Sequence, residues 1–135
     1  MSIKKSKKPK KNVSKIDNTN ESESLPPRFS FRYLSKDSKY GYESLEKDHK
    51  VDLINKIVRL SQYTWAELRH LDRHKLGSEK IDKTSLNINL PEVVTEDTNI
   101  LAFRFSGMIT MLGFRSTWGT FYVIGFDSKF TAYKH

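Results

Sequence analysis

Residues 99–135 read NILAFRFSGMITMLGFRSTWGTFYVIGFDSKFTAYKH, and this stretch decides the fold. It consists of short runs rich in Phe, Ile, Val, Tyr and Thr, which suit a pleated, half-buried surface. Turn-forming pairs separate these runs at Ser106-Gly107, Trp118-Gly119 and Asp127-Ser128. The pattern predicts an antiparallel meander of three or four strands, which the upstream elements should cover or extend.

The chain before residue 61 predicts one strand followed by a helix. Arg28–Ser35 alternates aromatic and polar side chains, which is the period of a strand. Residues 45–60 change to helical spacing, with charged residues between the apolar ones. The apolar stripe of this helix consists of Leu53, Ile54, Ile57 and Val58. Such a stripe needs a sheet or another helix to cover it.

A second, shorter helix is expected from Trp65 to about Lys75, because Thr64 and Glu67 match a capping box. Alternating apolar residues at Ser85–Leu90 then predict a further strand. The resulting order is strand, helix, helix, short strand and meander. It indicates an α+β fold in which two helices pack on one face of an antiparallel sheet.

The positive charge is concentrated at the N-terminus. The net charge of the chain is +8, and residues 1–28 contain eight basic residues against three acidic ones. We therefore expect residues 1–27 to form a disordered, Lys-rich tail and residues 28–135 to form a single compact domain. Two interpretations of the tail stay open: a solubilising segment, or an arm that binds nucleic-acid phosphates. The lysines of such an arm would include Lys4, Lys5, Lys7 and Lys8.

Several classes of protein are disfavoured by composition. The chain has no cysteine, which excludes disulfides and thiolate zinc sites. No apolar run is long enough for a bilayer span, and no apolar stretch follows the N-terminal lysines as in a secretory signal. The chain also lacks a Gly-Xaa-Ser-Xaa-Gly elbow and a phosphate-binding Gly loop. We expect a soluble, cytoplasmic protein without a membrane, cofactor or small-molecule partner.

The second predicted helix carries a basic face. Arg69 and Arg73 are four residues apart, as are His70 and His74, so each pair shares one side of the helix. This face is interpreted either as an ordinary solvated surface or as a contact for RNA phosphates or an acidic partner. The two histidines have no third ligand in the sequence pattern, so no metal site is predicted.

Basic and aromatic residues also mark the meander. Arg104 lies between two Phe residues and Arg115 follows another, so both should point away from the apolar face. Together with Tyr133 and His135 they would form a cationic, aromatic surface, with Lys129 at the last turn. Arginines can stabilise charge on a scissile phosphate, and Tyr or His can transfer a proton. The alternative is an ordinary solvent-facing sheet surface.

These runs resemble the RelE/ParE superfamily of small bacterial toxins from toxin–antitoxin modules. The resemblance covers roughly residues 28–135 and is carried by LAFRFSG, MLGFR, TFYVIGF and the closing YKH. It implies a metal-independent endoribonuclease that cleaves mRNA on the ribosome and is neutralised by an antitoxin protein. It further implies that Arg104 and Arg115 bind phosphate, while Tyr133 or His135 transfers the proton.

Two other kinds of function stay open. One is a non-catalytic module, from a phage or another mobile element, that binds nucleic acid or protein through the sheet and the basic tail. The other is a small interaction protein whose sheet pairs with a partner strand. A steep salt dependence of nucleic-acid binding would distinguish them, because phosphate contacts release counterions.

Overall fold

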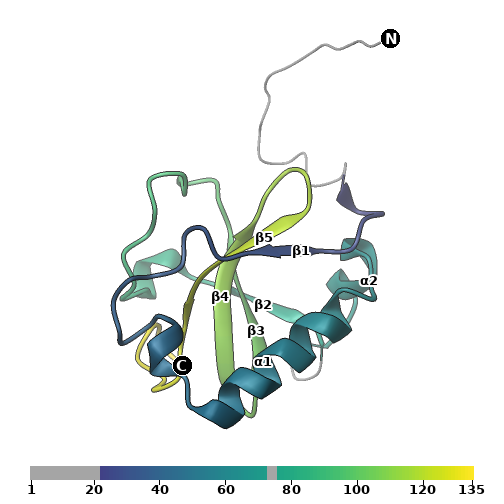
Figure 1. Ribbon diagram of the computed structural model, residues 1–135. Coiled ribbons are helices and arrows are strands. Elements are labelled where there is room, and N and C mark those ends of the chain that lie inside the picture. Colours follow the sequence, from purple (N-terminus) through teal and green to yellow (C-terminus); the bar gives the residue numbers. More distant parts are fainter. Residues whose placement is uncertain (1–21, 73–75) are drawn as a thin grey trace.

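The computed structural model describes residues 22–72 and 76–135. Its main elements, in chain order, are β1 (Arg28–Ser30), α1 (Lys47–Leu60), α2 (Trp65–Arg69), β2 (Ser78–Ile81), β3 (Ile100–Ser106), β4 (Ile109–Arg115) and β5 (Thr120–Phe126). Two short 3-10 helices, η2 (Tyr42–Ser44) and η3 (Lys83–Ser85), lie in the connections. The predicted α+β class is confirmed (Figure 1).

The strands form one five-stranded sheet in the order β1-β5-β4-β3-β2. The predicted antiparallel meander corresponds to β3, β4 and β5, and β2 extends it by antiparallel pairing with β3. β1 instead pairs with β5 in parallel, so the sheet is mixed and not purely antiparallel as expected. Gly107 and Gly119, with φ of 59° and 92°, take left-handed conformations in the two hairpin connections.

The two faces of the sheet are covered differently. We call the apolar cluster under α1 and α2 the helix-side core, whose buried residues include Leu53, Leu60, Trp65, Phe103 and Phe121. The cluster on the opposite face is the loop-side core, and its buried residues include Tyr40, Ile88, Leu112, Ala132 and Tyr133. Both helices therefore pack on one face, as predicted, while irregular segments cover the other.

Two strand predictions were wrong in extent or place. The first strand ends at Ser30 and not at Ser35, because the carbonyl of Phe31 accepts a hydrogen bond from the Leu34 amide and turns the chain. The strand expected at 85–90 does not form. Its apolar residues pack against the loop-side core from an irregular segment, so their alternation reflects burial without strand pairing.

The helix predictions were correct in position and wrong in detail. On α1 the buried residues are Leu53, Lys56 and Leu60, whereas Ile54 and Val58 are exposed, so the predicted stripe is rotated toward solvent. The capping box at Thr64 and Glu67 is present, but α2 ends at Arg69. The expected continuation to about Lys75 enters residues 73–75, which lie outside the described part of the chain.

Within residues 22–72 and 76–135, no helix has the length and apolar character needed to cross a membrane. The tail prediction for residues 1–27, including Lys4, Lys5, Lys7 and Lys8, falls almost entirely outside the described residues.

Candidate active site in the C-terminal loop

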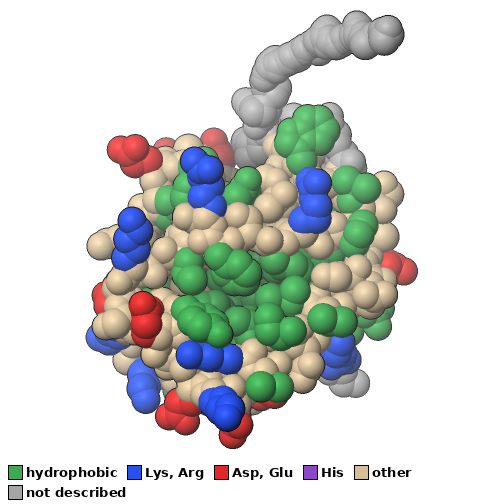
Figure 2. Space-filling view, viewed as in Figure 1, with side chains coloured by type: hydrophobic (Ala, Val, Ile, Leu, Met, Phe, Trp, Pro, Cys, Tyr) green, Lys and Arg blue, Asp and Glu red, His purple; other side chains and the backbone are tan. Residues whose placement is uncertain are grey.

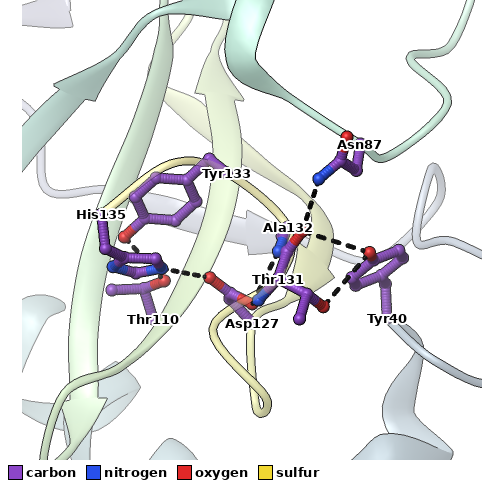
Figure 3. A network of polar contacts seen from close by, with 8 residues as sticks. All are labelled: Tyr40, Asn87, Thr110, Asp127, Thr131, Ala132, Tyr133 and His135. Carbon is purple, nitrogen blue, oxygen red and sulfur yellow. Dashed lines mark hydrogen bonds and ion pairs between the residues drawn. The ribbon is translucent and has the colours of Figure 1, made fainter.

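A buried aspartate organises residues 127–135, which we call the C-terminal loop. Asp127 has no exposed surface and follows directly after β5. Its Oδ1 accepts hydrogen bonds from the backbone amides of Thr131 and Ala132, at 2.8 and 2.9 Å. Its Oδ2 lies 2.7 Å from Nε2 of His135 (Figure 3). One carboxylate thus closes the loop and holds an imidazole.

This pairing determines which ring nitrogen of His135 can act on a ligand. A carboxylate only accepts hydrogen bonds, so the Nε2 that faces Asp127 carries a proton. In the neutral ring the lone pair is then on Nδ1. The His135 side chain is 31% exposed, which leaves part of the ring open to solvent. The arrangement is that of a general base whose tautomer is held by a buried carboxylate.

Tyr133 supports the ring from one side. The two rings stack with their centroids 4.2 Å apart and an angle of 30° between their planes. The Tyr133 hydroxyl lies 3.3 Å from Oγ1 of Thr110 on β4. Burial raises the pKa of Tyr133, so its phenol stays protonated at neutral pH. Tyr133 is therefore better suited to position His135 than to remove a proton.

The C-terminal loop is held in place by contacts to other parts of the chain. The side-chain Nδ2 of Asn87 donates to the Thr131 carbonyl at 2.6 Å, and the backbone amide of Asn87 donates to the Ala132 carbonyl at 2.7 Å (Figure 3). The Asp127 amide also donates to the Thr110 carbonyl at 3.0 Å. These contacts fix the loop against β4 and against the segment between η3 and β3. A site with such support is pre-organised for chemistry.

Arg104 lies next to this site. It pairs with Thr110 across β3 and β4, just before a bulge between Arg104 and Ser106. Strand alternation puts it on the same face as Ala102, which belongs to the loop-side core. Its positive charge acts on Tyr133, partly opposing the rise in the pKa of the phenol. Three of the four predicted catalytic residues, Arg104, Tyr133 and His135, therefore lie near one another.

Arg115 is elsewhere, so the four predicted residues do not share one surface. It lies five residues beyond Thr110 on β4, a separation of roughly 17 Å along a strand. Its guanidinium lies 4.5 Å from the Trp65 ring and bonds to Ser22 and Glu23, at 2.7 and 2.8 Å. These contacts tie the start of the described chain to α2 and to the end of the sheet. They indicate a structural role for Arg115.

The predicted nucleic-acid contacts are scattered. Arg69 is exposed on α2 and forms an ion pair with Glu23, while Lys129 is exposed in the C-terminal loop. Arg73 and His74 lie outside the described residues, and His70 caps the end of α2. In the described ranges, no group of three or more His, Asp or Glu side chains is placed to hold a metal ion.

The sequence interpretation missed Asp127, which it treated only as a turn residue. A signal was present: an aspartate directly after an apolar strand, followed within eight residues by Tyr and His. That order is compatible with a tight loop that returns onto its own first residue. The burial of the carboxylate and its pairing with His135 depend on that closure, which spacing alone does not specify.

Comparisons with protein-family models, with curated proteins and with solved structures found no match for this chain. The functional assignment therefore depends on the geometry of the site itself.

Proposed function

We propose that this chain is a metal-independent endoribonuclease, of the RelE-like toxin type, that acts on mRNA. The observation that supports this best is the 2.7 Å contact between buried Asp127 and partly exposed His135. It supplies the one group such a reaction needs most, a base that can remove the proton of an RNA 2′-hydroxyl. Arg104, whose charge acts on the neighbouring Tyr133, is the cation that would bind the phosphate.

In the proposed reaction, Nδ1 of His135 takes the proton from the 2′-hydroxyl. The 2′-oxygen bonds to phosphorus, and the bond between phosphorus and the 5′-oxygen breaks. The 5′-oxygen leaves with a proton from water, and the other product ends in a 2′,3′-cyclic phosphate. The hydroxide that forms takes the proton from the His135 imidazolium, which restores the base. Asp127 stabilises the imidazolium that forms, and Arg104 stabilises the charge that develops on the phosphate.

The remaining predicted residues take other roles in this proposal. Tyr133 positions His135 by stacking, and its buried hydroxyl bonds within the fold. Lys129, which is exposed in the same loop, would contact the phosphate backbone beyond the cleaved bond. As expected from the resemblance, the partners would be mRNA on the ribosome in the cytoplasm and an antitoxin that covers this loop.

The test compares His135→Gln with His70→Gln. The second variant is a matched control, because His70 is an exposed histidine at the end of α2, outside the C-terminal loop. Induction of the parent chain should arrest growth and create new mRNA ends, and His135→Gln should abolish both while His70→Gln retains them. In vitro, cleaved RNA should carry 2′,3′-cyclic phosphate, and a 2′-deoxy substitution at the cleaved position should prevent cutting. Normal growth and uncut RNA with folded parent protein would overturn the proposal.

A second candidate function, a protein-binding module, is favoured by the exposed side of α1. Val51, Ile54 and Val58 follow helical spacing and are 55%, 57% and 55% exposed. Figure 2 shows hydrophobic side chains gathered between β1 and α1. Phe29 of β1 and Ile57 of α1 are only partly buried. An apolar segment of a partner protein would fit this surface. Loss of partner binding in Ile54→Asp, with RNA left uncut by the parent chain, would favour this function.

A further inference from the structure

A second polar site lies on the face of the sheet that α1 covers, opposite the face that carries the C-terminal loop. A cleft of about 460 Å³ opens between α1 and the β3–β4 hairpin. Its walls include Asp52, Asn55, Lys56 and Arg59 from α1, with Arg104 and Phe105 from β3. Its volume is within the range typical of small-molecule sites.

Positive charge dominates the lining of this cleft. Two cations of α1, Lys56 and Arg59, line it together with a single carboxylate, that of Asp52. That carboxylate already accepts a hydrogen bond from the Ser106 hydroxyl at 2.6 Å. The charges within the cleft are therefore unbalanced in favour of an anion.

The position of Lys56 reinforces this charge pattern. It is only 6% exposed, on the face of α1 that packs toward the sheet, where an apolar residue would be expected. Burial lowers the pKa of Lys56 to about 8, and the neighbouring charge of Arg59 adds to this effect. An anion in the cleft would favour the charged form of Lys56 and offset its repulsion with Arg59.

We propose that this cleft binds the phosphate group of a nucleotide, with Lys56 and Arg59 as its principal cations. Arg59 supplies a planar set of donors suited to phosphate oxygens, and Asn55 adds a neutral amide beside it. Phe105 forms an apolar wall against which the rest of the ligand can pack. The proposal does not require RNA cleavage and holds equally if the chain has no catalytic activity.

The phosphate could belong to a free mononucleotide or to an RNA strand, and binding measurements distinguish them. Calorimetric titrations of the full chain with inorganic phosphate, a nucleoside 5′-monophosphate and a short single-stranded RNA compare the two sources. If the cleft binds a free nucleotide, the monophosphate should bind at least as tightly as the RNA on a per-site basis. If it binds a strand, affinity should rise with the number of phosphates and fall steeply with salt.

Arg59→Gln is the decisive variant, because Arg59 is exposed on α1 and its loss should leave the fold intact. We expect it to weaken phosphate binding about tenfold, as removal of one charge-assisted contact does. The matched control is Lys47→Gln, which removes an exposed charge from the same helix outside the cleft lining and should change affinity less than about twofold.

A pH series with sulfate, whose charge is constant near neutrality, gives an independent readout of Lys56. Affinity should fall as the pH rises past about 8, where Lys56 loses its charge. The other charged residues that line the cleft are Asp52, Arg59 and Arg104. Binding that is weakened equally by Arg59→Gln and Lys47→Gln would mean general charge attraction and overturn the site. Absence of binding by all three phosphate probes would overturn it as well.

Discussion

Replacement of Asp127 should separate the stability of the C-terminal loop from its chemistry. In Asp127→Ala, the amides of Thr131 and Ala132 lose the acceptor that now lies 2.8 and 2.9 Å away. A buried donor left without a partner costs about 1–3 kcal/mol. Because Ala132 is fully buried and Thr131 is not, we expect about 2 kcal/mol for the first amide and about 1 for the second. The free energy of unfolding should fall by about 3 kcal/mol.

Asp127→Asn keeps an oxygen at the same place, so both amides retain an acceptor. We expect it to lower the free energy of unfolding by only about 1 kcal/mol. It removes the negative charge that holds Nε2 of His135 as the donor, and RNA cleavage should fall at least about a hundredfold. The predicted result is therefore a stable protein with little activity.

Urea denaturation near neutral pH, followed by tryptophan fluorescence, measures both losses, and cleavage of a labelled RNA measures activity. Asp97→Ala is the control, because Asp97 is an exposed aspartate in a loop and should change stability by less than about 0.5 kcal/mol. If Asp127→Ala were as stable as this control, the role of Asp127 as the closing contact of the loop would be refuted. Full activity in Asp127→Asn would refute the proposed part of the carboxylate in proton transfer.

Three further predictions concern the rest of the fold. Gly113→Ala should lower the free energy of unfolding by at least about 2 kcal/mol in urea titrations, because a Cβ there would lie 2.7 Å from the Phe121 ring. Lys56→Met should stabilise the protein near neutral pH by about 1–2 kcal/mol after allowance for solvent screening. The pKa of Lys56 falls from 10.5 in the unfolded chain to about 8 in the folded one, so the unfolded chain binds more protons between these two pH values. The free energy of unfolding of the parent should therefore rise with pH in that interval. Denaturation at several pH values should show that Lys56→Met lacks this rise. Arg115→Gln should lower the free energy of unfolding by about 1–2 kcal/mol through loss of its contacts to Ser22 and Glu23. The RNA cleavage rate of the folded variant should be unchanged, and a large drop in that rate would mean that Arg115 takes part in catalysis.

Periodicity was sufficient to identify the meander and the approximate position of both helices. Strand alternation and turn residues are local properties, and so is the capping box at Thr64 and Glu67, which forms as expected. The strand prediction at Ser85–Leu90 was wrong, because the alternating apolar side chains there pack on the loop-side core from an irregular segment. It also failed on α1, where Ile54 and Val58 match helical spacing but face solvent.

The candidate site was predicted only in part. Tyr133 and His135 could be nominated from their residue types, since few side chains transfer protons near neutral pH. Arg104 and Arg115 looked equivalent, because each stands beside a Phe in an apolar strand. Their positions at opposite ends of the sheet follow from the pairing register and from the contact of Arg115 with Trp65, which no local pattern contains.

The α+β class, the antiparallel meander, the capping box at Thr64 and Glu67 and the nomination of a Tyr and a His near the C-terminus could all be read from the sequence, because each depends on neighbours a few residues apart. Only the tertiary structure decided that β1 joins β5 in parallel, that Lys56 is buried beside Arg59, and that Asp127 holds His135. These features depend on which side chains are removed from water together. Asp127 pairs with the His135 imidazole because the fold buries its carboxylate, and burial depends on the whole fold.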